Sequence, residues 1–168
     1  MAFARLSLET LGLLDEGNPS ENDRATADEL DGIPEWFIGP LISSLVAHEV
    51  GHTLGLRHNF KASGLYTLEE INSEEIRGNK PFTASVMDYN PVNFNMDTGE
   101  VQGDFAMIGI GSYDLWAIEY GYTFDKLEDV LKRSSDPTNA YLTDEDTSGP
   151  DPLAKRYDFS KDPLTYAK

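Results

Sequence analysis

One stretch decides the fold of this chain: His48-Glu49-Val50-Gly51-His52-Thr53-Leu54-Gly55-Leu56-Arg57-His58. Residues four apart on a helix lie about 40° apart around its axis and roughly 6 Å along it, so His48 and His52 can direct their imidazoles at one ion. Glu49 lies about 100° round from His48. Its carboxylate is therefore placed to act on a water at that ion rather than to bind the ion itself.

The third histidine requires a break in this helix. If the helix continued, His58 would lie about 9 Å beyond His52 and would be rotated by roughly 240°, too far to share the ion. Gly55 has no Cβ and can adopt the left-handed conformation that ends a helix and turns the chain. We therefore expect His58 to return as a third ligand, with a fourth position left open for water as in a catalytic zinc site.

The donors available for a metal are nitrogen and oxygen. The chain has no cysteine, so it can form neither a disulfide nor a thiolate site. Its three histidines are the three of this stretch. A lone histidine on an apolar helix face is more often a core residue, but three histidines at this spacing favour a metal site.

The remaining patterns predict a mainly helical chain. Apolar residues at three- and four-residue intervals after Pro40 predict a largely buried helix that stops near Gly55. They are Leu41, Ile42, Leu45, Val46, Val50 and Leu54. Thr67 and Glu70 have the spacing of a capping box, which predicts a short helix over 68–77 ended by Gly78. Turns are expected over 85–103.

Two further helices are expected near the C-terminal end. One covers about 113–119, with Ser112 as N-cap and Asp114 in the first turn, where a negative charge suits the helix dipole. Thr123 is expected to cap the other, whose apolar face ends before Ser134 and consists of Phe124, Leu127, Val130 and Leu131. The polar residues of 15–34 predict an exposed connection.

Length and charge limit the classes of protein that fit. With 168 residues and 39% hydrophobic residues we expect one domain over 1–168, with its core over 36–135 and an irregular polar tail over 136–168. Thirteen basic and thirty acidic residues give a net charge of −17, which argues against nucleic acid as a partner. No apolar run approaches the length of a membrane span, so membrane insertion is not expected.

His48 to His58 resembles the extended zinc motif of the metzincins, a clan of zinc endopeptidases. The resemblance implies an α+β fold that is mainly helical in this chain. It also implies that His48, His52 and His58 bind Zn²⁺ and that Glu49 is the general base of peptide hydrolysis. Such domains usually place a mixed sheet before the zinc helix, and because fewer than fifty residues precede it here, we expect that sheet to be truncated.

Two later stretches strengthen the resemblance. Ser85-Val86-Met87-Asp88-Tyr89 is similar to the Met-turn, which implies that Met87 lies beneath the metal. In two branches of the clan a tyrosine two places after this methionine approaches the zinc or the reacting carbonyl, and Tyr89 has that position. Residues 111–121 resemble the helix that closes metzincin catalytic domains.

Taken together, the motifs look most like a group of large bacterial zinc-dependent metallopeptidases. That likeness implies a peptide or protein substrate, a longer parent polypeptide and a secreted, periplasmic or cell-surface location.

Three alternatives remain open on the sequence alone. The third ligand could be a downstream glutamate, namely Glu69, Glu70, Glu74 or Glu75. The chain could be a non-catalytic module that binds zinc or a partner and is inactive as a fragment. Calcium could bind near Gly99 and Gly103 through Asp97, Glu100 and Asp104, although acidic residues in such a cluster more often belong to a solvated turn that binds no cation.

Overall fold

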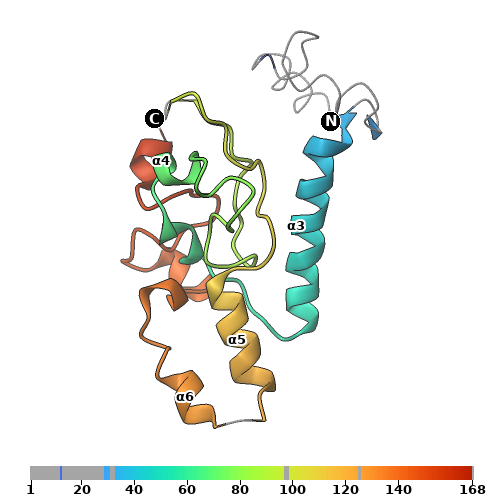
Figure 1. Ribbon diagram of the computed structural model, residues 1–168. Helices are drawn as coiled ribbons and strands as arrows, with labels where there is room; N and C mark the ends of the chain where they lie inside the picture. Colours follow the sequence, from blue (N-terminus) through green and yellow to red (C-terminus); the bar gives the residue numbers. More distant parts are fainter. Residues whose placement is uncertain (1–11, 13–28, 31–32, 97–98, 125, 168) are drawn as a thin grey trace. The chain divides into compact units, whose positions relative to one another are not determined.

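The computed structural model describes residues 12, 29–30, 33–96, 99–124 and 126–167 (Figure 1). The chain divides into two compact units, 1–42 and 43–168, and each is considered by itself. In the first unit, β1 (Glu29–Leu30) pairs antiparallel with β2 (Ile33–Pro34), with Leu30 opposite Ile33. Ile33 is buried, so the prediction of an exposed connection is wrong at that residue.

Helices and turns dominate the rest of the described chain, as Figure 1 shows. The α-helices are α3 (Glu35–Thr53), α4 (Leu68–Ile71), α5 (Ser112–Tyr122), α6 (Leu127–Leu131) and α7 (Pro163–Tyr166). The 3-10 helices are η1 (Ala62–Leu65), η2 (Pro137–Asn139) and η3 (Asp144–Ser148). The expectation of an α+β fold that is mainly helical is confirmed. None of the helices within the described residues is long and apolar enough to cross a membrane.

The core of the second unit joins segments that are distant in the sequence. Its largest cluster contains Ile71, Ile76, Phe82, Val86, Met87, Met107 and Phe159. Phe159 is fully buried although it lies beyond residue 135, in a stretch whose composition is polar. A smaller cluster packs α5 against η1 through Tyr113, Ala84 and Ala62.

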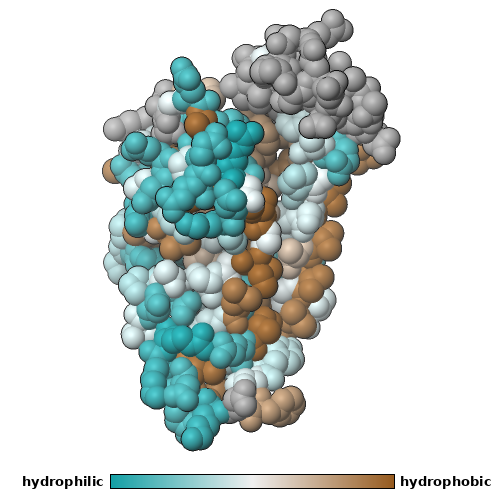
Figure 2. Space-filling view, in the orientation of Figure 1, coloured by the Kyte–Doolittle hydropathy of each residue, from teal (hydrophilic) through white to brown (hydrophobic). Residues whose placement is uncertain are grey.

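The prediction that α3 is largely buried is wrong for most of its apolar residues. Ala47 packs against the core cluster, and His48 and Gly51 are buried. Five of the apolar side chains in the predicted pattern are 42–60% exposed, the last of them just after the helix ends: Ile42, Leu45, Val46, Val50 and Leu54. In Figure 2 apolar surface lies along this helix. The apolar pattern correctly predicts a helix. Its apolar residues lie on several faces of that helix, and the core of this unit covers only one of them.

The helix boundaries differ from the predictions where side chains serve other contacts. The capping box of Thr67 and Glu70 is present, yet α4 ends at Ile71 because the side chain of Asn72 is buried and bonds to Gly103 and Asn93. Helix α5 begins at Ser112 itself, with Gly111 as its N-cap. Helix α6 begins at Leu127.

The predicted apolar face of α6 is also partly wrong. Phe124 precedes the helix and is fully exposed, and Leu127 and Leu131 are exposed as well. Val130 is the buried apolar residue of this helix, and its carbonyl accepts a hydrogen bond from the indole of Trp116 in α5. A salt bridge at 2.6 Å between Arg133, just after α6, and Glu119 of α5 adds to this hydrogen bond.

Candidate metal centre

Helix α3 ends in a glycine turn. Gly55 has φ +89°, the amide of Gly55 donates to the carbonyl of His52 at 3.0 Å, and the amide of Leu56 donates to the carbonyl of Gly51 at 3.0 Å. These two bonds form the Schellman motif, in which a left-handed residue satisfies the last carbonyls of a helix and reverses the chain. The break at Gly55 that the sequence predicts is present, and it directs the chain back toward the helix.

This turn brings the three histidines together. One ring nitrogen from each of His48, His52 and His58 lies within 4.8 Å of the other two. The centroids of the rings are 4.7 Å apart for His48 and His52, 4.9 Å for His52 and His58, and 5.4 Å for His48 and His58. Within the described residues this is the cluster that could hold a metal ion.

Hydrogen bonds at Nδ1 orient all three rings. The Nδ1–H of His48 donates to the carbonyl of Val86 at 2.7 Å, and that of His52 donates to the carbonyl of Leu56 at 3.0 Å. The Nδ1–H of His58 donates to the carboxylate of Asp144 at 3.0 Å. Each imidazole therefore carries its proton on Nδ1 and directs Nε2 away from that hydrogen bond, which is the arrangement found around zinc-binding histidines.

Burial supports the neutral form of the deepest imidazole. Desolvation is the main cause that lowers the pKa of His48, and the positive charge that His52 and His58 could carry acts in the same direction. Metal binding requires a deprotonated Nε2. The three nitrogen donors and their orientation fit a divalent cation such as zinc.

The Met-turn lies directly under the helix. Met87 is fully buried and belongs to the core cluster. Asp114 fastens this turn to α5, because its carboxylate accepts hydrogen bonds from the hydroxyl of Ser85, the amide of Val86 and the amide of Gly111. The sequence identified Asp114 only as a first-turn acid, and nothing in its spacing indicated that it holds the turn that supports His48.

Gly51 allows this close packing, which gives a first prediction. A Cβ at residue 51 would overlap the sulfur of Met87, whose side chain is fully buried in the core cluster. We expect Gly51→Ala to lower the free energy of unfolding by about 1–3 kcal/mol, despite the higher helix propensity of alanine. Urea unfolding measures the change. Gly121→Ala in α5, where a Cβ meets no atom within 4 Å, should leave stability unchanged or raise it.

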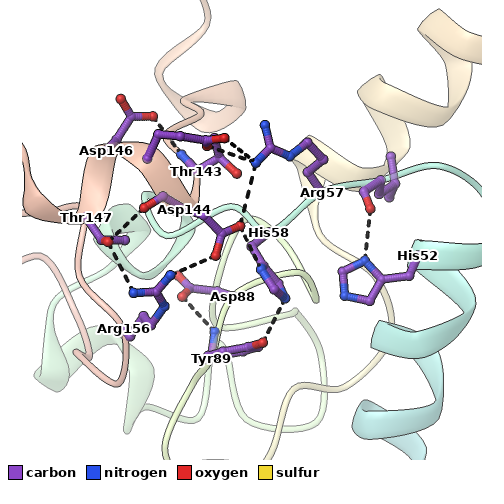
Figure 3. A network of polar contacts seen from close by, with 12 residues as sticks. His52, Arg57, His58, Asp88, Tyr89, Thr143, Asp144, Asp146, Thr147 and Arg156 are labelled. Carbon is purple, nitrogen blue, oxygen red and sulfur yellow. Dashed lines mark hydrogen bonds and ion pairs between the residues drawn. The ribbon is translucent and has the colours of Figure 1, made fainter.

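Tyr89 points at the histidine cluster. Its hydroxyl lies 2.8 Å from Nε2 of His58, and its ring packs 4.6 Å from the His58 ring and 5.6 Å from the ring of Tyr157 (Figure 3). Burial raises the pKa of Tyr89, so the hydroxyl stays protonated at neutral pH. It donates a hydrogen bond to Nε2 of His58. The phenol thus lies beside Nε2 of His58, the ring atom that would bind a metal.

Glu49 is exposed on α3, one residue after His48. Among the residues that the structure describes, its carboxylate forms no hydrogen bond or salt bridge. A carboxylate without a structural contact is available for proton transfer.

Two buried carboxylates, Asp88 of the Met-turn and Asp158, accept hydrogen bonds from Ser63 of η1. The amide of Ser63 donates to Asp88 at 2.9 Å, and the hydroxyl of Ser63 donates to Asp158 at 2.9 Å. Desolvation raises the pKa of Asp88 to about 8 and that of Asp158 to about 6. The folded protein therefore binds these protons more tightly than the unfolded chain does.

This shift gives a prediction for stability against pH. The contribution of Asp88 to stability is fully present below the ordinary carboxyl pKa of 3.8 and is lost as the pH rises through about 8. Asp88→Asn removes the titration, so the stability of the variant relative to the native protein should rise by a few kcal/mol, on the order of 3, between pH 5 and pH 9. Urea unfolding of both proteins across this range checks it, and parallel pH curves would contradict it.

The helix that supplies two histidines, its glycine break, the returning third histidine and the methionine beneath them together define a site of the metzincin class. The chain belongs to the Met-zincin family, whose model matches residues 31–168. A comparison with curated proteins and one with solved structures gave no match. Membership points to a metallopeptidase, with peptides or proteins as substrates and zinc as the usual metal.

Proposed function

We propose that this protein is a zinc-dependent endopeptidase in which His48, His52 and His58 bind the metal and Glu49 is the general base. The observation that carries the proposal is the geometry of the three imidazoles, whose ring nitrogens lie within 4.8 Å of one another while every Nδ1 is held by another acceptor. Three imidazole ligands would leave one tetrahedral position open, which distinguishes a catalytic zinc site from a structural one.

Zinc bound there would polarise the scissile carbonyl and lower the pKa of a bound water toward neutrality. Glu49 takes the proton of the attacking water and returns it to the departing amine. The hydroxyl of Tyr89 donates a hydrogen bond to the oxygen of the carbonyl as negative charge develops on it. Its 2.8 Å contact with Nε2 of His58 supports this role, because the phenol then lies beside the ring atom that would bind the metal.

Tyr89→Phe should separate binding from catalysis. Removing one hydrogen-bond donor to the developing oxyanion typically lowers kcat by about a hundredfold. The affinity for zinc should change by less than about threefold, because the three imidazoles and their Nδ1 contacts remain. Steady-state kinetics and a zinc competition titration measure both quantities. Tyr157→Phe keeps the ring stacked on Tyr89 and is the matched control, with unchanged kcat.

The proposed activity can be tested directly. The zinc-loaded protein is incubated with a denatured protein and with a library of internally quenched peptides, with and without a chelator. We expect internal peptide bonds to be cleaved, the chelator to stop cleavage and added zinc to restore it. A protein that holds zinc stoichiometrically but cleaves nothing would instead support the non-catalytic module. A location outside the cytoplasm, which the family resemblance suggests, stays a prediction.

A further inference from the structure

One histidine of the cluster differs from the other two in its Nδ1 partner. His48 and His52 donate to neutral backbone carbonyls, whereas His58 donates to the carboxylate of Asp144. Hydrogen bonds to an ionised acceptor are roughly twice as strong as neutral ones. A carboxylate behind a metal-binding imidazole fixes its tautomer and strengthens the coordinating nitrogen.

The Asp144 carboxylate is held by charges on both sides (Figure 3). Nη2 of Arg156 donates to Oδ1 at 2.7 Å, and Nη2 of Arg57 lies 3.9 Å from Oδ2. Arg57 is itself bound to both carboxylate oxygens of Glu145, at 2.8 and 2.9 Å. Two guanidinium groups therefore lie beside the carboxylate that accepts from His58, one on each of its oxygens.

Arg156 is anchored on the same group of aromatic rings as His58. Its guanidinium lies 4.9 Å from the centre of the Phe60 ring, and that ring, fully buried, packs 5.2 Å from the His58 ring. The next residue, Tyr157, stacks on Tyr89. Consecutive residues of one segment therefore support the two groups that contact His58, one at Nδ1 and one at Nε2.

The element that carries Asp144 is tied into this segment. In η3 the amide of Thr143 donates to Asp146 at 2.9 Å, and the hydroxyl of Thr147 donates to the carbonyl of Asp144 at 2.9 Å. Lys155 donates to the carbonyl of Thr147 at 2.8 Å, and Arg156 donates to its hydroxyl at 3.2 Å. The three bonds of Thr147 fix the position of Asp144 relative to Arg156, and so relative to His58, whereas the bond between Thr143 and Asp146 caps η3.

We propose that Asp144, held by Arg156, is a positioning residue for His58: its carboxylate keeps the imidazole in the Nδ1–H tautomer and directs Nε2 at the metal. This inference rests on the proposed function only in taking the three histidines as metal ligands. Residues 144–156 are then a structural support of the metal centre, although the sequence predicts only an irregular tail there.

Zinc affinity tests the proposal. Asp144→Ala and Asp144→Asn are compared with the native protein by competition with a chromophoric chelator. Loss of a carboxylate behind a zinc-binding histidine typically costs 10–100-fold in metal affinity, and we expect Asp144→Ala in this range. Asp144→Asn keeps the shape and an acceptor oxygen but loses the charge, so we expect about a tenfold loss. Asp146→Asn, in the same 3-10 helix but bonded to Thr143 instead of His58, is the matched control and should bind zinc as the native protein does.

The tautomer of His58 provides a readout that a purely structural role would not change. Long-range ¹H–¹⁵N NMR of the zinc-free native protein and Asp146→Asn should show the Nδ1–H form of His58. In Asp144→Ala the Nε2–H form should appear. If the alanine variant fails to fold, the zinc affinity of Asp144→Asn carries the test. Zinc affinities within threefold of the native value, or an unchanged tautomer, would overturn the proposal. Neither measurement requires a substrate, so failure of the peptidase assignment is seen separately.

Discussion

Glu49→Gln should abolish peptide hydrolysis while zinc stays bound. Glutamine has nearly the same shape as glutamate but cannot accept a proton from water, and a positioned general base contributes about 10²–10⁴ to the rate. Because the same group also returns the proton to the leaving amine, we expect a loss of several orders of magnitude. The hydrolysis rate of a quenched peptide and the zinc content by mass spectrometry measure the two effects.

The control for this variant is Glu69→Gln, which makes the same chemical change at an exposed residue of α4. It should leave both rate and zinc content unchanged. A Glu49→Gln protein that hydrolyses peptides at the native rate would refute the assignment of Glu49.

His58→Ala should remove tight zinc binding. It leaves two imidazoles on one helix face, and a site with two protein ligands is incomplete for catalytic zinc, which has three. We expect the dissociation constant for zinc to rise by about a thousandfold or more, measured by chelator competition. If a downstream glutamate were the third ligand, the same substitution would leave zinc affinity nearly intact.

The structure already assigns other contacts to most of those glutamates. Glu70 accepts the amide of Thr67 at 2.8 Å, Glu75 pairs with Lys80 at 2.6 Å, and Glu74 lies 3.9 Å from Arg77. Replacing Glu69, Glu70, Glu74 and Glu75 together by glutamine should therefore keep zinc bound. Loss of zinc from that variant would favour the glutamate alternative.

The contacts that the sequence predicts correctly are local. The approach of His48 and His52 follows from helical geometry, and the turn at Gly55 follows from the absence of a Cβ. The capping box of Thr67 and Glu70 is equally local, since its two bonds join residues three apart. Backbone sterics over a few residues determine such features, so they can be read without knowing the rest of the fold.

The contacts that the sequence does not predict join distant segments. His58 and Asp144 are 86 residues apart, and the interval contains no pattern that pairs them. The early end of α4 has the same cause, because the buried amide of Asn72 is shared with Gly103 and Asn93. The exposed apolar residues of α3 were not predicted either, because a helical pattern predicts a helix but not which of its faces the core covers.

In the calcium alternative, Asp104 has a structural contact in place of a cation. Asp97 lies outside the described residues, and the carboxylate of Asp104 accepts the amide of Gly78 at 2.7 Å. Gly78 has φ +67°, so this bond holds the left-handed turn that follows the loop after α4. A structural contact of this kind accounts for Asp104 without a cation.

A crystal structure of the native protein loaded with zinc tests the central claim most directly. The account predicts one zinc ion bound to Nε2 of His48, His52 and His58 at roughly 2.0–2.1 Å, with a water in the fourth position beside the Glu49 carboxylate. Zinc bound by any other set of side chains, or three imidazoles that stay apart in its presence, would contradict it.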